Sequence, residues 1–331
     1  MPQKSDQRIR VALVYGGRSG EHEVSLRSAE SVRKALNRDR YEIADFFISK
    51  EGKWEPRPLS PEPGGNPEID VVFPVLHGTF GEDGTIQGLL EMAELPYVGA
   101  GVMASAISMD KGMTKRLCKQ AGLPVAEYVV LNRGQFDPQC LRLPFEFPVF
   151  VKPANLGSSV GISKAKNCTE LKTALECAAQ YDRKIIVEKG IIGREFECAV
   201  LDGAPPSASV PCEIKPSQEF YTYEDKYLLD TARIDLPADL DAKQTSRMQQ
   251  LAVACFEAVD CEGMARVDFL MDGKTGEFYI NEINTIPGFT SISMYPKMWA
   301  HSGIAYSELL DRLIDLALAR AAARRAIRYS R

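Results

Sequence analysis

The segment RVDFLMDGKTGEFYINEIN, residues 266–284, has the pattern of two β-strands joined by a tight turn. Residues 265–271 and 277–284 are mostly apolar, and DGKTG between them suits a hairpin loop. Polar side chains nevertheless recur within these strands. If residues near 268 pair with residues near 280, strand alternation predicts one shared face for Arg266, Asp268, Glu282 and Asn284.

Two interpretations of this polar face are open from the residues alone. Neighbouring carboxylates repel each other, so the pair needs a proton or a cation. Arg266 neutralises both acids in a surface ion-pair cluster, or Asp268, Glu282 and Asn284 offer oxygen ligands to Mg²⁺. Mg²⁺ takes few protein ligands and completes its shell with water and phosphate oxygens.

A second segment, FPVFVKPANLGSSVGISKA at residues 147–165, has features that suit phosphate binding. Lys152 ends an apolar strand, and a loop of small residues then leads into another strand. Gly157, Ser158 and Ser159 allow backbone N–H groups to approach phosphate oxygens. The lysine precedes the loop and a strand follows it, so this is not the loop of P-loop NTPases. By itself, a hairpin turn with an exposed lysine explains the segment as well.

Weaker signals lie on either side of this loop. Glu188 and Glu195 flank KGIIGR, and Glu195 suits ribose hydroxyls. The simpler alternative is that both acids face solvent on an edge strand. Lys111 starts a predicted helix over residues 109–123, where lysines are usually solvated.

The rest of the chain predicts three stretches, 1–100, 101–187 and 188–331. In the first, strands at 9–15, 41–49 and 70–76 alternate with a helix over 24–36, which predicts a parallel α/β sheet, and residues 56–67 form a surface loop. The second is an α+β segment, with strands at 125–131, 147–153, 160–165 and 184–189 and a helix over 171–180. The third contains a strand at 195–201, a polar loop at 217–227, a helix over 243–259, the hairpin and two closing helices.

Composition excludes several classes of protein. The 331 residues suit two or three domains, and a net charge of −5 disfavours nucleic acid and anionic membranes as partners. No apolar run approaches the ~18 residues of a membrane span, and the polar N-terminus lacks a signal peptide's apolar region. Eight scattered cysteines predict buried thiols in a reducing cytosol. The basic segment 320–331 predicts a solvated helix end.

Taken together, these segments resemble the ATP-grasp enzymes, and within them the D-alanine–D-alanine ligase family. YGGRSGEHEVS at 15–25 resembles the family's N-terminal signature, and LHGTFGEDGTIQG at 76–88 and residues 266–296 resemble its two diagnostic motifs. The resemblance implies an ATP-grasp fold with an N-terminal Rossmann-like parallel α/β domain (1–100). A central domain with the phosphate loop (101–187) and a C-terminal domain with the metal site and a lid loop (188–331) would follow.

The resemblance also implies a reaction, in which ATP and two D-alanines give D-alanyl-D-alanine, ADP and phosphate through D-alanyl phosphate. It implies two Mg²⁺ or Mn²⁺ ions per site, a homodimer, a cytoplasmic location and a role in peptidoglycan precursor synthesis. Neither nucleic acid nor a membrane is an implied partner.

The implied roles of the residues fall into four groups. The metal ligands are Asp268, Glu282 and Asn284; the nucleotide is bound by Lys111, Lys152, Ser158, Ser159, Glu188, Lys189, Ile191, Glu195 and Lys226. The substrates are bound by Glu21, His77, Ser293 and Met294, and the catalytic group comprises Glu21, Ser158, Tyr227, Arg266 and Gly288. Arg266 and the Gly288 N–H would stabilise an oxyanion, while Tyr227 would link the lid to Ser158 and Glu21. For His77, an ordinary hydrogen-bonded loop histidine is the alternative.

Other functions fit the residues less well. A D-alanyl-D-lactate ligase usually alters the residue matching Tyr227, which is present here. Another ATP-grasp carboxylate–amine ligase would share the nucleotide and metal residues. A Rossmann dehydrogenase is disfavoured because GGRSGE is not G-x-G-x-x-G, and a non-catalytic nucleotide sensor would be expected to lose Arg266 or the metal ligands.

Overall fold

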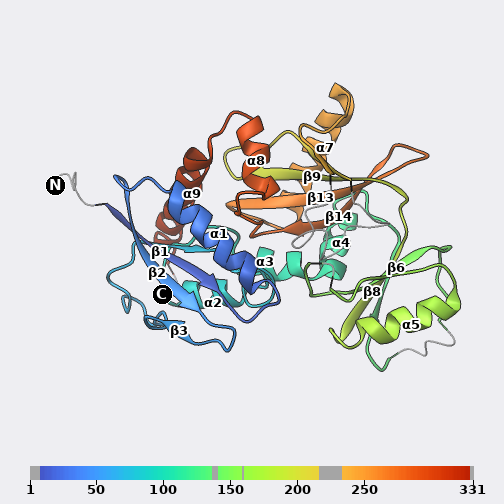
Figure 1. Cartoon of the computed structure of the whole chain (residues 1–331), viewed down its shortest axis with the longest axis horizontal. Helices are drawn as coiled ribbons and strands as arrows, with labels where there is room; N and C mark the ends of the chain where they lie inside the picture. The colour runs from blue at the N-terminus through green and yellow to red at the C-terminus, as the bar shows by residue number, and fades with distance from the viewer. Residues whose placement is uncertain (1–7, 136–140, 159, 216–232, 329–331) are drawn as a thin grey trace.

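The computed structural model describes residues 8–135, 141–158, 160–215 and 233–328 and arranges them around three β-sheets (Figure 1). Three of the predicted site residues, Ser159, Lys226 and Tyr227, lie outside the described residues.

The first sheet has the strand order β3 (Trp54–Glu55), β2 (Tyr41–Ile48), β1 (Ile9–Gly16), β4 (Val71–Pro74). As predicted, β1 pairs in parallel with β2 and β4. Val11 and Leu13 share a core with α1 (His22–Ala35), whereas Ala12 and Val14 share one with α2 (Thr85–Met92). Burial on both faces explains the unbroken apolar run of β1.

The second sheet is antiparallel, in the order β5 (Tyr128–Asn132), β8 (Lys184–Lys189), β6 (Val149–Pro153), β7 (Ser163–Ala165). Helix α5 (Cys168–Ala178) packs on β6 and β7. Strand β8 is interior, so the edge-strand alternative for Glu188 is wrong.

The third and largest sheet has the order β12 (Arg233–Asp235), β11 (Cys212–Lys215), β9 (Gly193–Leu201), β13 (Met264–Asp272), β14 (Phe278–Asn284), and β10 (Ser207–Ala208) pairs with β9. Helix α7 (Ala242–Ala258) covers the face that carries Val267 and Phe269. The alternate residues Arg266 and Asp268 therefore point to the opposite face.

The predicted hairpin is present, and a β-bulge adjusts its register. Asp268 lies opposite Glu282 and Arg266 opposite Asn284, but Phe269 pairs with Ile280. Asn281 is the extra residue of the bulge. The four polar residues thus share a face, as the alternation predicts, and Asn281 joins Glu282 in lining a cavity.

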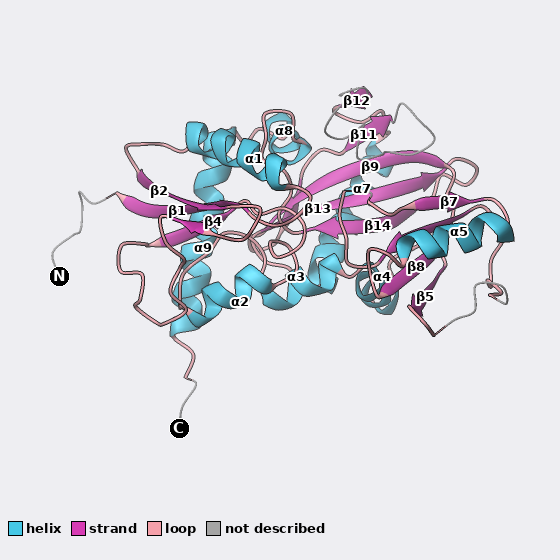
Figure 2. Ribbon diagram, turned by 60° about the horizontal axis from the view of Figure 1, so that its bottom comes forward, coloured by secondary structure: helices cyan, strands magenta, loops and turns pink. Residues whose placement is uncertain are grey.

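Helices α3 (Val102–Met109) and α4 (Lys111–Gln120) run from the first sheet toward the other two (Figure 2). Helix α8 (Met294–His301) precedes α9 (Tyr306–Arg325), which packs against β4 and α1. The end of the chain therefore returns to its beginning. Within the described part of the chain, no helix has the length and apolarity needed to cross a bilayer.

Two expectations need correction. The basic end of α9 is not simply solvated: Arg320 donates to the carbonyls of Tyr97 and Gly99, and Arg324 forms ion pairs with Glu91 and Glu262. The cysteines are not all buried, because Cys168 is exposed at the first position of α5.

Candidate active site

Two adjoining cavities lie over the polar face of the largest sheet. One, of about 390 Å³, is lined by residues of the second and third sheets, including Lys152, Glu188 and Asp268. The other, of about 210 Å³, is lined by residues of the first part of the chain and the third sheet, including Glu21, His77 and Arg266. They share the residues Gly157, Ser158, Glu197 and Glu282. We call them the larger and the smaller cavity.

Arg266 makes a two-point ion pair on this face. Its Nε and Nη2 donate to the two oxygens of Asp268, each at 2.7 Å, and its Nε lies 3.3 Å from Glu197 Oε2. Burial disfavours the charge of Arg266, but Asp268 and Glu197 outweigh it and raise its pKa. Arg266 is thus paired with Asp268 and Glu197, whereas Glu282 Oε2 lies 3.3 Å from Lys111 Nζ. The ion-pair interpretation therefore holds for Arg266 and Asp268, but Glu282 also pairs with Lys111, and the cluster is partly buried and not at the surface.

The hairpin residues fit a hard divalent cation only in combination with further oxygens. Asp268 and Glu282 lie opposite each other, and Asn284 Nδ2 donates to Asp268 Oδ2 at 3.1 Å. Among the described residues no cluster of three or more His, Cys, Asp or Glu side chains suits a metal. Two carboxylates and an amide oxygen match the sparse protein ligation of Mg²⁺, with phosphate oxygens filling the other positions.

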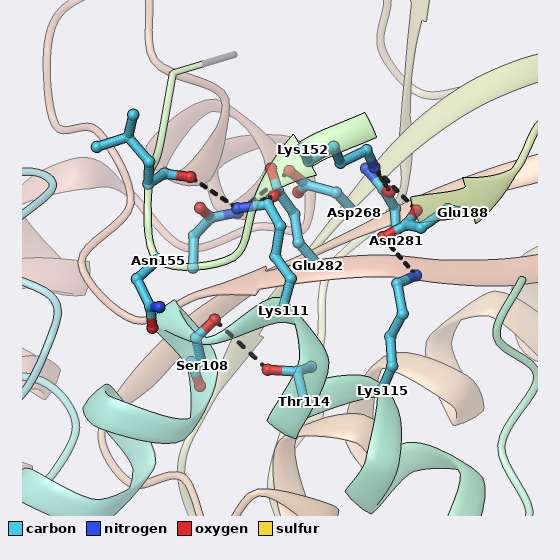
Figure 3. A network of polar contacts seen from close by, with 12 residues as sticks. Ser108, Lys111, Thr114, Lys115, Lys152, Asn155, Glu188, Asp268, Asn281 and Glu282 are labelled. Carbon is cyan, nitrogen blue, oxygen red and sulfur yellow. Dashed lines mark hydrogen bonds and ion pairs between the residues drawn. The ribbon is translucent and has the colours of Figure 1, made fainter. Parts of the chain in front are cut away.

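Three lysines and two acids lie close together beside the larger cavity, Lys111 with Glu282 and both Lys115 and Lys152 with Glu188 (Figure 3). Lys111, the first residue of α4, donates to the Leu156 carbonyl at 2.8 Å and is buried, contrary to the solvated alternative. Lys152 Nζ donates to Glu188 at 2.9 Å and to Asn281 Oδ1 at 3.1 Å. Burial opposes the charges of Lys152 and Glu188. Glu188 nevertheless raises the pKa of Lys152, and Lys115 and Lys152 together lower the pKa of Glu188, so Lys152 and Glu188 both stay charged.

The loop after β6 lies where the two cavities meet, because its residues Gly157 and Ser158 line both of them. Ser158 has a φ of +54°, which is uncommon for a residue other than glycine and is typical of functional loops. Its hydroxyl donates to Glu21 Oε1, which joins the second sheet to the start of α1. This is the contact implied by the resemblance.

His77 is buried in the wall of the smaller cavity. Its Nδ1 lies 3.0 Å from the Ile286 carbonyl, which can only accept, so the proton of the neutral ring is on Nδ1. Its Nε2 lies 2.8 Å from Ser28 Oγ, and Ser28 Oγ accepts from Phe289 N–H at 3.3 Å. Burial disfavours protonation of the ring, but Glu82 outweighs it and raises the pKa of His77.

The loop after β14 supplies the far wall of the smaller cavity. Ser293 is the N-cap residue of α8 and its Oγ accepts from Thr290 N–H at 3.0 Å. Met294 is the first residue of α8, so its N–H lies at the positive end of the helix dipole. A Cβ at Gly288 would lie 2.6 Å from Ser293 Oγ, so a larger residue there would displace the Ser293 hydroxyl.

The remaining predicted nucleotide residues line the larger cavity. Lys189 is the last residue of β8 and Ile191 lies just after it, and Lys189 also pairs with Glu127 at 2.8 Å. Glu195 lies on β9, an interior strand, so the edge-strand alternative is wrong for it as well.

Sequence reasoning missed four residues, namely Ser28, Lys115, Glu197 and Asn281. Glu197 lies on β9 directly opposite Asp268, and this strand pairing brings a third carboxylate into the row. Asn281 reaches the larger cavity because of the β-bulge, and the sequence pattern does not predict that bulge. Lys115 stands four residues after Lys111, a helical spacing that places both on one side of α4 and was a usable signal.

Comparison with known proteins gives the family. A family model described as the D-ala D-ala ligase N-terminus matches residues 10–63 and 60–100, and one described as the D-ala D-ala ligase C-terminus matches residues 117–315. A D-alanine–D-alanine ligase from Solibacter usitatus (strain Ellin6076) is 61% identical, covering 98% of this chain and 100% of its own. The chain belongs to the D-alanine–D-alanine ligase family.

Other members of the D-alanine–D-alanine ligase family agree in sequence and in fold. A D-alanine–D-alanine ligase A from Bradyrhizobium diazoefficiens is 50% identical over 95% of this chain and 96% of its own. The D-alanine–D-alanine ligase structure from Coxiella burnetii superposes with a TM-score of 0.87 at 37% identity, covering 96% of each chain. The VanG D-Ala:D-Ser ligase from Enterococcus faecalis gives 0.85 at 35% identity, covering 94% of this chain and 100% of its own. The predicted family and ATP-grasp fold class are confirmed.

Proposed function

We propose that this protein is a D-alanine–D-alanine ligase that uses ATP to activate one D-alanine and joins it to a second. The observation that carries the proposal is the junction of the two cavities at Ser158 and Glu282. Lysines gather in the larger cavity, whereas Glu21, His77 and Arg266 line the smaller. A nucleotide in the first and amino acids in the second would meet at this junction, which the chemistry requires.

The proposed reaction has two steps. A carboxylate oxygen of the first D-alanine attacks the γ-phosphorus of ATP, and the bond to the β,γ-bridging oxygen breaks to give D-alanyl phosphate and ADP. The neutral amine of the second D-alanine attacks the acyl carbon, and the carbon–oxygen bond to phosphate breaks. The second amine loses a proton as the amide forms.

The nucleotide residues offer charge for the first step. Lys111 and Lys152 line the larger cavity and would hold the α- and β-phosphates (Figure 3). Glu188, Lys189 and Ile191 would surround the adenine, and Glu195 would accept from the ribose. The predicted roles of Ser159 in nucleotide binding and of Lys226 at the γ-phosphate stay predictions outside the described residues.

Asp268, Glu282 and Asn284 would be the ligands of two Mg²⁺ or Mn²⁺ ions. A bound metal would supply positive charge between the two anionic reactants. The two oxygens of Asp268 have lone pairs to spare, so Asp268 could ligate a metal while it accepts from Arg266, and Glu197 lies 3.3 Å from Arg266 as a second carboxylate.

The substrate residues would act in the smaller cavity. Glu21 would accept from the ammonium of the first D-alanine, and the Ser293 hydroxyl and Met294 N–H would bind the carboxylate of the second. Arg266 and the Gly288 N–H would stabilise the oxyanion, and losing one such donor typically costs about 3–4 kcal/mol. His77, whose ring is fixed by hydrogen bonds to Ser28 and to the Ile286 carbonyl, would orient the second substrate.

The decisive experiment is product analysis with labelled substrate. The protein is incubated with ATP, Mg²⁺ and D-alanine carrying ¹⁸O in its carboxylate. We expect D-alanyl-D-alanine and phosphate in equal amounts, with one ¹⁸O in each phosphate because the acyl-phosphate oxygen leaves with phosphorus. Phosphate without ¹⁸O, or the absence of dipeptide, contradicts the proposal. Parallel reactions with D-lactate or D-serine as the second substrate test the depsipeptide and D-Ala–D-Ser alternatives.

We also propose that the protein is a cytoplasmic homodimer. The seven cysteines of the described residues are free, which suits a reducing compartment. Met92 of α2 and Val102 and Met103 of α3 are 66%, 40% and 56% exposed, and these packed helices offer an apolar surface for a second copy. Light scattering should give about twice the chain mass of 36.6 kDa, and Met103→Glu should lower it toward one chain.

A further inference from the structure

Lys115 is a buried lysine to which the proposed reaction assigns no task. It lies on α4, one turn after Lys111, with 1% of its surface exposed. Its Nζ is 3.4 Å from Glu188 Oε1 and 3.5 Å from the Ile280 carbonyl. It lines neither of the two cavities. Burial lowers the pKa of its ammonium and the charge of Glu188 opposes this shift, so a positive charge here is costly to hold without that partner.

Glu188 lies between two lysines. Lys152 reaches it from the cavity side at 2.9 Å, and Lys115 reaches it from α4 (Figure 3). Glu188 is 2% exposed, and its Oε1 receives no hydrogen bond from the residues that the structure describes. One carboxylate therefore holds two ammonium groups, although a single lysine would suffice to neutralise it.

The second lysine becomes necessary when an anion arrives. Lys152 faces the larger cavity, and a phosphate that binds there would share its ammonium with Glu188. With one cation between them, the phosphate and Glu188 compete for it and repel each other at low local dielectric. Lys115 supplies a second positive charge to Glu188 from the side away from the cavity. Lys152 is then available to the phosphate.

We propose that Lys115 is a positioning residue for nucleotide binding, which holds Glu188 so that Lys152 can serve the phosphates. The inference rests on the proposed function, because it takes the ligand of the larger cavity to be a nucleotide. It extends that function by one residue that touches no ligand.

A purely structural role for Lys115 makes a different prediction. In the absence of nucleotide, Lys152 alone can neutralise Glu188, and a methionine of similar volume can replace the buried Lys115 side chain. The positioning role therefore predicts that Lys115→Met folds with a melting temperature close to that of the unmutated protein. A structural role predicts a large loss of stability.

The test compares two nucleotide-site probes by isothermal titration calorimetry. MgADP carries phosphates and adenosine carries none, so only MgADP depends on Lys152. We expect Lys115→Met to weaken MgADP binding by at least about tenfold. A tenfold loss corresponds to only a small part of the free-energy cost of leaving a buried charge unpaired. Adenosine binding should weaken by a clearly smaller factor, because adenosine would meet Glu188 at the proposed adenine site but carries no phosphate that competes for Lys152. Equal changes for both probes, unchanged MgADP binding or a variant that does not fold would each overturn the proposal.

Two further variants sharpen the result. In a Glu188→Gln background, Lys115→Met should weaken MgADP binding little further, since the charge that it compensates is gone. Lys184→Met removes another ion-paired lysine, which bonds Asp110 at 2.6 Å and lines neither cavity. It should leave the ratio of MgADP to adenosine affinity unchanged. If the unmutated protein binds neither probe, the proposed function itself fails, an outcome distinct from those for the variant.

Discussion

At the scale of single residues, Glu282 is the group on which the proposed chemistry depends most. It lines both cavities and lies 3.3 Å from Lys111. Glu282→Gln keeps the shape but removes one anionic ligand, so we expect dipeptide synthesis to fall by about a hundredfold to a thousandfold, as for lost charge stabilisation in a transition state. Mn²⁺ binding followed by electron paramagnetic resonance should weaken as well.

The control for this prediction lies on the same hairpin. Glu277 immediately precedes β14, is exposed and lines neither cavity, so Glu277→Gln should leave both measurements unchanged. Near-normal turnover in Glu282→Gln would refute its assignment as a metal ligand.

Ser28 is a second residue whose importance only the structure shows. Its hydroxyl connects His77 Nε2 to the Phe289 N–H, next to Gly288. We expect Ser28→Ala to lower kcat/KM for D-alanine about tenfold, because both walls of the smaller cavity lose a fixed partner. Ser25→Ala, on the same helix, also loses two buried hydrogen bonds, but to Gly16 and Val75. Both variants should lose about 1–3 kcal/mol of stability, so equal activities in the two would show that Ser28 is structural only.

At the scale of elements, the hairpin of β13 and β14 could be predicted because its apolar residues alternate with charges. The bulge at Asn281 and the neighbour β9 could not, since pairing between distant strands leaves no local pattern. Glu197 is therefore recognised as a site residue only from the strand pairing in the sheet, because the sequence motif does not include it. In the same way, β8 is an interior strand because β5 pairs along its outer side. The sequence of β8 alone did not exclude an edge strand.

The pairing of β9 with β11 gives a pH prediction. Arg194 donates to both oxygens of the buried Glu213 at 2.8 and 2.7 Å, and these hydrogen bonds lower the pKa of Glu213. Because the folded pKa lies below the unfolded value of about 4.3, the stabilisation is present above that pH and is lost as pH falls through the folded pKa.

We expect Glu213→Gln to lose about 1–2 kcal/mol of unfolding free energy at pH 7, with the difference shrinking below about pH 4. Urea unfolding at a series of pH values measures this. Glu308→Gln removes an exposed pair with Arg312 and should cost at most about 0.5 kcal/mol at any pH. A Glu213→Gln difference that stays constant down to pH 3 would contradict the assignment.

At the scale of the whole molecule, most of the longer helices and strands followed from the sequence. The helices α2 and α3, the short strands β3, β10, β11 and β12, and the way the chain closes on itself did not. The basic segment after residue 320 has the composition of a solvated helix end. In the structure α9 returns to the first sheet, and Arg320 reaches the connection between that sheet and α3. An arginine that binds backbone carbonyls has no sequence signature, because its acceptors are present at every residue.

Arg320 therefore holds two parts of the molecule together. Its Nη1 and Nη2 donate to the carbonyls of Gly99 and Tyr97 at 2.6 and 2.7 Å, and its guanidinium lies 4.4 Å from the centre of the Tyr97 ring. We expect Arg320→Ala to lower the unfolding free energy by about 2–4 kcal/mol, since two partly buried carbonyls lose charged donors. Arg312→Ala, on an exposed stretch of the same helix, should cost at most about 0.5 kcal/mol.

The same substitution also tests whether the first sheet must be held in place for the smaller cavity to bind substrate. Glu21 and His77 come from the first part of the chain, and Arg266 and Ser293 come from the last. Loosening the connection at residues 97–99 should therefore raise the KM for D-alanine severalfold, while the affinity for MgADP in the larger cavity changes by less than about twofold. An affinity for MgADP that falls by the same factor as the KM for D-alanine rises would contradict this prediction. The effect of Arg320→Ala would then be a general loss of stability and not a change confined to the smaller cavity.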